Sequence, residues 1–112
     1  MPVFAADKLT ELSTRLLEGM GTPRDAARSV AENCLYGHDS HGMALLPRFI
    51  KDVETGKIKP KAVTETVKRS VSAARIDGHR GFGQLTTRDA MSTAIEIAKE
   101  TGVSAVTADN CN

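Results

Sequence analysis

The chain has 112 residues, which suits one ordinary domain and is too short for two well-built ones. Its 15 basic and 14 acidic residues give a formal net charge of +1 and are interspersed, so the sequence lacks the basic footprint of a nucleic-acid binder. No window approaches the run of about 18 apolar residues that a membrane span needs, and the first residues do not form a signal-peptide pattern. We therefore expect a cytoplasmic protein with no nucleic-acid partner and no membrane span.

Helical spacing dominates the first half of the sequence. Leucines recur three and four residues apart over residues 6–18 and predict a helix with one apolar stripe. The stripe consists of Leu9, Leu12, Leu16 and Leu17. Thr22 is expected to cap a second helix that ends near Gly37, and a third helix resumes at about Met43.

The second half alternates strands with one long helix. The expected elements are a strand over 63–68, a weaker strand over 72–77, a loop with three glycines over 78–83, a helix over 84–101 and a buried strand over 103–107. This order predicts the α/β class with an α+β-like character: a helical amino-terminal region over 1–58 and the start of an α/β domain over 59–112. Because the sequence stops directly after a strand, where α/β proteins place functional loops, we expect the domain to be truncated.

The segment from Gly37 to Arg48 gathers the side chains most suited to chemistry. His41 and Arg48 are seven residues apart, so on one continuous helix they would face the same side. An arginine binds a carboxylate and a histidine exchanges a proton with a nearby oxygen, which suits a substrate with a carboxylate beside a carbonyl. The alternative is a polar turn in which Ser40 or Asp39 caps the third helix.

A hydrolase of the Ser-His-Asp type is poorly supported by the same segment. Residues adjacent in sequence cannot form the geometry of a catalytic triad, and the sequence has no G-x-S-x-G motif. We expect no metal site, because no His/Cys pair has ligand spacing. Cys34, inside the second predicted helix, is expected to be a buried small hydrophobe.

The glycine loop after the second predicted strand partly matches a dinucleotide-binding fingerprint. Gly78-His79-Arg80-Gly81-Phe82-Gly83 lies between a strand and a helix, but Thr86 stands where the third glycine should be. Asp109, near the end of the next strand, is a candidate for the ribose-binding acid. The favoured interpretation is a turn whose glycines let helix and strand approach closely, with His79 and Arg80 exposed. Half of a Rossmann fold is the alternative.

These motifs together resemble one enzyme family. Gly37-His38-Asp39-Ser40-His41-Gly42, followed by Leu46-Pro47-Arg48-Phe49, resembles the hallmark of the malate/L-lactate dehydrogenase type-2 family. The glycine loop matches further, and Asn110-Cys111-Asn112 resembles the lead-in to a second family motif, in which a catalytic histidine follows. The resemblance covers nearly the whole sequence. It implies a non-Rossmann dehydrogenase fold that is incomplete here.

The resemblance also implies a function. Members transfer a hydride between NAD or NADP and a small 2-oxo or 2-hydroxy acid such as malate or lactate, and are typically homodimers. Ser40, His41 and Arg48 are then the catalytic residues, with Arg48 binding the substrate carboxylate, while the cofactor-binding residues stay unassigned. The resemblance places the usual proton-transfer histidine directly after Asn112 and a lysine further on. The 112 residues alone are therefore expected to be inactive, because positioning and proton transfer must act together. The alternative is a standalone α/β interaction module without catalytic activity.

Overall fold

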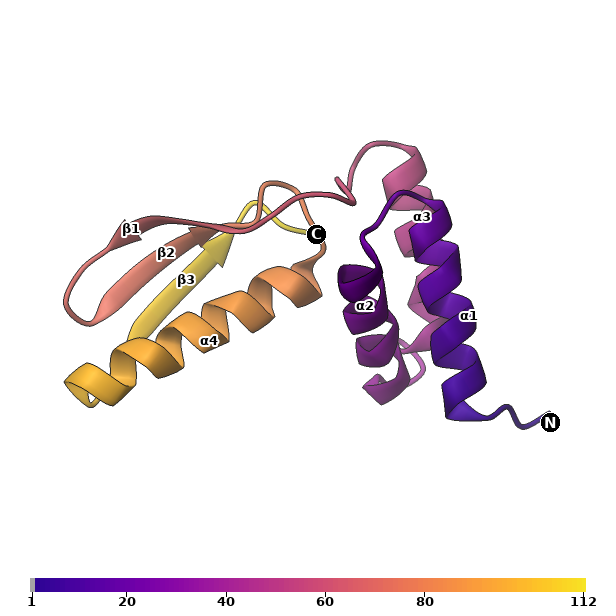
Figure 1. Ribbon diagram of the computed structural model, residues 1–112, viewed down its shortest axis with the longest axis horizontal. Coiled ribbons are helices and arrows are strands. Elements are labelled where there is room, and N and C mark those ends of the chain that lie inside the picture. The colour runs from indigo at the N-terminus through magenta and orange to yellow at the C-terminus, as the bar shows by residue number, and fades with distance from the viewer. Residues whose placement is uncertain (1) are drawn as a thin grey trace. The chain divides into compact units, whose positions relative to one another are not determined.

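Figure 1 shows the computed structural model, which describes residues 2–112. The elements follow the order α1 (Ala6–Gly19), α2 (Arg24–Tyr36), the 3-10 helix η1 (Met43–Leu45), α3 (Leu46–Glu54), β1 (Glu65–Arg69), β2 (Ala73–Asp77), α4 (Gly83–Thr101) and β3 (Ala105–Asp109). They form two compact units, the first extending to Lys61 and the second comprising Ala62–Asn112. This mixed α/β architecture confirms the predicted fold class.

In the first unit, α1 packs against α2 through small side chains. Thr10, Ser13, Thr14 and Leu17 form the buried face of α1, and Ala27, Val30, Ala31 and Cys34 form that of α2. The hydroxyl of Thr14 donates to the Thr10 carbonyl at 2.7 Å, so this polar group is buried without losing a hydrogen bond. Small facing residues let the two helices approach closely.

The leucine stripe of α1 is not the side of the helix that is buried. Leu17 is fully buried, but Leu12 is 56% exposed and Leu16 is 43% exposed. Helical spacing identifies residues that share a side, yet it does not decide which side meets the neighbouring helix. Here the side that carries the hydroxyls meets α2, because its smaller side chains fit the alanines opposite.

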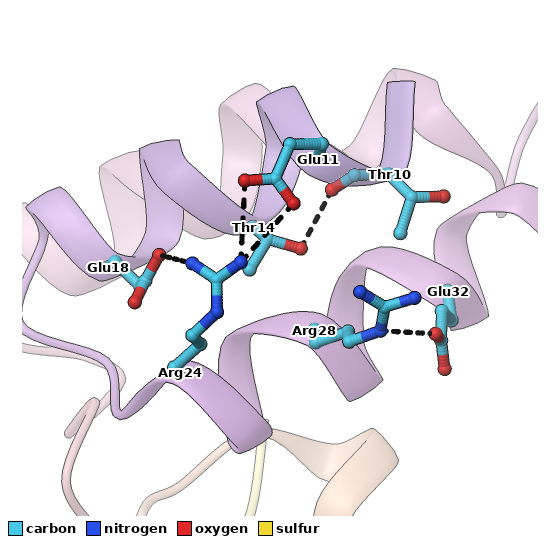
Figure 2. A network of polar contacts seen from close by, with 7 residues as sticks. All are labelled: Thr10, Glu11, Thr14, Glu18, Arg24, Arg28 and Glu32. Atoms are coloured by element: carbon cyan, nitrogen blue, oxygen red, sulfur yellow. Dashed lines mark hydrogen bonds and ion pairs between the residues drawn. The ribbon is translucent and has the colours of Figure 1, made fainter. Parts of the chain in front are cut away.

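Ion pairs connect α1 with the beginning of α2, as Figure 2 shows. Arg24 Nη1 lies 2.8 Å from Glu18 Oε2, and Arg24 Nη2 lies 3.3 Å from Glu11 Oε2. Both carboxylates raise the pKa of the Arg24 guanidinium, and the largest cause is the hydrogen bond that Arg24 donates to Glu11. The three side chains are between 31% and 54% exposed, so these ion pairs add little to stability.

The predicted cap at Thr22 is also wrong. Its backbone N–H donates to the Leu17 carbonyl, which ties it to the end of α1 rather than to the start of α2. Its side chain is buried, and within residues 2–112 its hydroxyl has no hydrogen-bond partner. Pro23 instead precedes the first helical residue.

The second unit is a three-stranded sheet covered by α4 (Figure 1). β1 pairs with β2 in antiparallel fashion, and β2 pairs with β3 in parallel fashion. Ala74, Ile76, Phe82 and Ile97 form its buried apolar core. The prediction that the last strand is buried is wrong, because β3 is an edge strand of the described sheet and four of its five residues are exposed.

Candidate functional site

A closed turn connects α2 to η1 and presents the candidate catalytic residues. The His41 N–H donates to the His38 carbonyl at 2.8 Å, and the Leu45 N–H donates to the Gly42 carbonyl at 3.0 Å. A Cβ atom on Gly37 would collide with the His41 carbonyl, so only glycine permits this close approach of two backbone segments. The glycines that flank Ser40 and His41 thus shape the turn that exposes them.

Ser40 and His41 form a direct side-chain pair. Ser40 Oγ lies 2.7 Å from His41 Nδ1, and both residues are exposed. If the hydroxyl donates to Nδ1, the neutral imidazole carries its proton on Nε2, where it is available to an external acceptor. The predicted capping role is wrong, because neither η1 nor α3 has a side-chain cap.

Arg48 projects from the first turn of α3 as an exposed cation. Its Nε lies 3.8 Å from Asp52 Oδ2, one helical turn further on, and its side chain is 67% exposed. A separation of 3.8 Å is too long for a charge-assisted hydrogen bond, so Asp52 holds the guanidinium only loosely. The prediction that His41 and Arg48 share one continuous helix is wrong, because α3 begins at Leu46 and His41 lies outside it.

A hollow of about 420 Å³ lies directly beside this turn. Its lining combines apolar side chains with two polar ones: Cys34, Leu35, Gly37, His38, Asp39, Gly42, Met43 and Ala44. Cys34 is 2% exposed, as predicted, and burial raises the pKa of its thiol. The thiol is therefore protonated near neutral pH and contributes to packing rather than to nucleophilic chemistry.

Two polar groups of the glycine loop and of β3 that a dinucleotide would need are engaged within the chain. A pyrophosphate would need the free N–H groups at the start of α4, but the Gly83 N–H donates to the Asn112 carbonyl. Asp109, the candidate ribose-binding acid, is paired with Arg75 at 2.6 Å. A Cβ atom at Gly78 would lie 2.7 Å from Thr86 Oγ1 in α4, so the loop is the close-packed turn that the sequence predicted.

Sequence reasoning missed Asp77 and its contact with Asn110 beside this loop. Asp77 accepts hydrogen bonds from the His79 backbone and from the Asn110 side chain. The side chain of His79 is 43% exposed, and its Nε2 lies 2.8 Å from Glu65 Oε2. The available signals were an aspartate at a strand end and an asparagine after the next strand.

A sequence profile described as malate/L-lactate dehydrogenase matches residues 4–112. The chain belongs to the malate/L-lactate dehydrogenase family. Hydroxycarboxylate dehydrogenase B of Escherichia coli (strain K12) is 32% identical over 111 residues, covering 96% of this chain and 31% of the relative. Malate dehydrogenase of Pyrococcus abyssi is 36% identical over 110 residues, covering 95% of this chain and 30% of the relative.

Solved structures of the malate/L-lactate dehydrogenase family share this fold. Sulfolactate dehydrogenase from Methanocaldococcus jannaschii superposes with a TM-score of 0.93 at 33% identity, covering 99% of this chain and 33% of that one. The chain thus spans about a third of the length of its relatives. Within residues 2–112 of this family member, no three His, Cys, Asp or Glu side chains gather as metal ligands. No helix in that range is long and apolar enough to cross a membrane.

Proposed function

We propose that the protein is a dehydrogenase that transfers a hydride between NAD or NADP and a small 2-oxo or 2-hydroxy acid. The observation that carries this proposal is the exposed pair in which Ser40 Oγ lies 2.7 Å from His41 Nδ1, in a chain of the malate/L-lactate dehydrogenase family. The names of its relatives, which include malate, sulfolactate and hydroxycarboxylate dehydrogenases, support a hydroxy-acid substrate.

The three candidate residues take different roles in this proposal. Ser40 fixes the imidazole tautomer, so that His41 directs its Nε2–H toward the carbonyl oxygen that becomes the substrate hydroxyl, while the proton itself comes from the histidine of the second family motif. Arg48, which Asp52 holds only loosely, binds the substrate carboxylate with its planar fork of N–H donors. The nicotinamide, when bound, supplies or accepts the hydride. We propose that its contacts come from regions of the family that this chain does not span.

Assembly and location follow from the same family assignment. We propose a homodimer, and the exposed apolar side chains of the first unit support it: Val3, Phe4, Leu12, Leu16 and Tyr36. Such surface is typical of proteins that bury it against a partner. Both cysteines are free thiols, which supports the proposed cytoplasmic location, where thiols are kept reduced.

The test is turnover by the product of the complete reading frame that encodes these residues. The purified product is mixed with NADH or NADPH and the 2-oxo acids that correspond to malate, lactate and sulfolactate, and oxidation of the nicotinamide is followed by absorbance. The methyl ester of each substrate carboxyl group serves as the matched control, because it keeps the ketone and removes the charge that Arg48 would bind. We expect turnover with at least one acid and a much lower kcat/KM with its ester.

Two results would refute parts of the proposal separately. Absence of turnover with every acid and both nicotinamides refutes the dehydrogenase and favours the interaction module. Equal kcat/KM for an acid and its ester refutes carboxylate recognition by Arg48 while leaving the hydride transfer intact.

A further inference from the structure

Backbone pairing continues beyond the ends of the two parallel strands. β2 ends at Asp77 and β3 ends at Asp109, and these residues are register partners. Past them, the N–H of Gly78 donates to the Asp109 carbonyl at 2.9 Å, and the N–H of Arg80 donates to the Asn110 carbonyl at 2.6 Å. The N–H of Asn112 then donates to the Gly81 carbonyl at 3.1 Å. The loop after β2 thus holds the segment that leaves β3.

One carboxylate oxygen, Oδ1 of Asp77, accepts hydrogen bonds from both loops. Asp77 Oδ1 accepts from the His79 backbone N–H at 2.7 Å and from Asn110 Nδ2 at 2.8 Å. Its side chain is only 26% exposed. The Arg75 guanidinium is paired with Asp109 on the same strands, and the His79 ring is paired with Glu65. The two donors to Asp77 come from the two loops that follow β2 and β3.

Both loops adopt a backbone conformation that needs such support. His79, Arg80 and Asn110 have φ values of +49°, +64° and +52°, in the left-handed region. Residues other than glycine adopt this region only when surrounding contacts hold them there. The contacts of Asp77 reach two of these three residues directly, so its carboxylate stabilises the local conformation of both loops.

We propose that Asp77 is a positioning residue that fixes the path of residues 110–112 as the chain leaves β3. In open α/β sheets, ligands bind outside the carboxyl ends of the parallel strands, and residues 110–112 lie at that edge. The consequence for catalysis rests on the proposed function: Asp77 touches no reacting atom, but it sets the path of the chain at the carboxyl ends of β2 and β3, where such sheets bind their ligands.

Amide hydrogen exchange tests the positioning independently of any activity. The variants are Asp77→Ala, which removes the acceptor, and Asp77→Asn, which keeps an acceptor oxygen at Oδ1. Asn110→Gly removes only the side-chain donor and still permits the positive φ. The amides followed are those of Arg80 and Asn112, with the amide of Ser70, which donates to the Ala73 carbonyl at the opposite end of the sheet, as the internal control.

We expect exchange at Arg80 and Asn112 to accelerate about tenfold in Asp77→Ala and Asn110→Gly, as loss of one hydrogen bond implies. Exchange at Ser70 should not change, and Asp77→Asn should restore slow exchange at Arg80 and Asn112. Unchanged exchange at these two amides in Asp77→Ala overturns the proposal. Equal acceleration at Ser70 also overturns it, because the effect would then be general destabilisation.

Turnover by the complete reading-frame product tests the catalytic consequence. We expect Asp77→Ala to lower kcat by about tenfold or more with little change in KM, because small misplacements of reacting groups are costly. Asp77→Asn should recover most of kcat. If exchange responds as expected but kcat does not, the positioning stands and its link to catalysis is wrong. If no variant and no wild-type protein turns over, the proposed function fails and the exchange result decides the positioning alone.

Discussion

Gly78→Ala should destabilise the second unit, because the added methyl group has no room. Its Cβ would lie 2.7 Å from Thr86 Oγ1, 2.8 Å from Cys111 Cβ and 3.1 Å from the Asn110 carbonyl. Ordinary contacts between carbon atoms are about 3.5–4 Å, so the Cβ is too close to Cys111 Cβ by roughly 1 Å. Thr86 is 1% exposed and bonded to the Phe82 carbonyl, so it cannot turn away.

Overpacking of this kind costs about 1–3 kcal/mol, and two contacts below 3.0 Å place Gly78→Ala in the upper half of that range. In a small domain each kcal/mol lowers the melting temperature by about 4–8 °C. Urea unfolding followed by far-ultraviolet circular dichroism measures the change. Fluorescence is a poor probe, because the sequence has no tryptophan and its one tyrosine, Tyr36, is 88% exposed in the first unit.

Gly19→Ala is the matched control for the same substitution. A Cβ at Gly19, the last residue of α1, meets nothing within 4 Å. Alanine is the better helix former, so Gly19→Ala should leave stability unchanged or raise it slightly. If Gly78→Ala unfolds within about 0.5 kcal/mol of the wild type, the close-packed interpretation of the glycine loop is refuted.

The remaining predictions concern thiols, acid and activity. Under native conditions one thiol per chain, that of Cys111, should react rapidly with Ellman's reagent, and Cys34 should react only after unfolding, because it is buried and its pKa is raised; two fast thiols would contradict the packing of α2. The hydrogen bonds from His79 and Asn110 lower the pKa of Asp77 below its ordinary 3.8. The ionised Asp77 carboxylate therefore stabilises the folded state above about pH 4, and this stabilisation is lost as the pH falls through the lower pKa of the folded state. The free energy of unfolding, measured with urea at a series of pH values, should fall less on acidification in Asp77→Asn than in the wild type. The 112-residue chain by itself should show no reduction of any 2-oxo acid, and nicotinamide oxidation above the protein-free blank would contradict this.

The sequence predicted the elements well, because periodicity and glycine punctuation are local signals. The helix ending before Gly102 is an example: Gly102 adopts a φ of +85°, which glycine adopts readily. The buried side of α1 was not predictable in this way. It depends on the small residues of α2 that face Ser13 and Thr14, and helical spacing alone favoured the leucines.

The candidate site shows the same division between local and long-range information. Ser40 and His41 are neighbours in sequence, so their contact is a local feature of a turn that glycines close. The prediction that His41 and Arg48 face the same side assumed one continuous helix, but the 3-10 helix η1 lies between His41 and α3. The contact of Asp77 with Asn110 joins the last residue of β2 to the residue that follows β3, and only the parallel pairing of β2 and β3 brings them together.

Arginine substitution in the complete reading-frame product tests the central claim most directly. Arg48→Lys keeps the charge but loses the planar fork, and Arg28→Lys is the control, because Arg28 also pairs with an acid four residues on, Glu32, at 2.9 Å (Figure 2). We predict that Arg48→Lys lowers kcat/KM for the preferred 2-oxo acid by about 10- to 100-fold, as loss of a charge-assisted hydrogen bond implies, while Arg28→Lys stays within about twofold of the wild type. Equal kcat/KM for Arg48→Lys and Arg28→Lys would contradict the assignment of Arg48 as the carboxylate-binding residue.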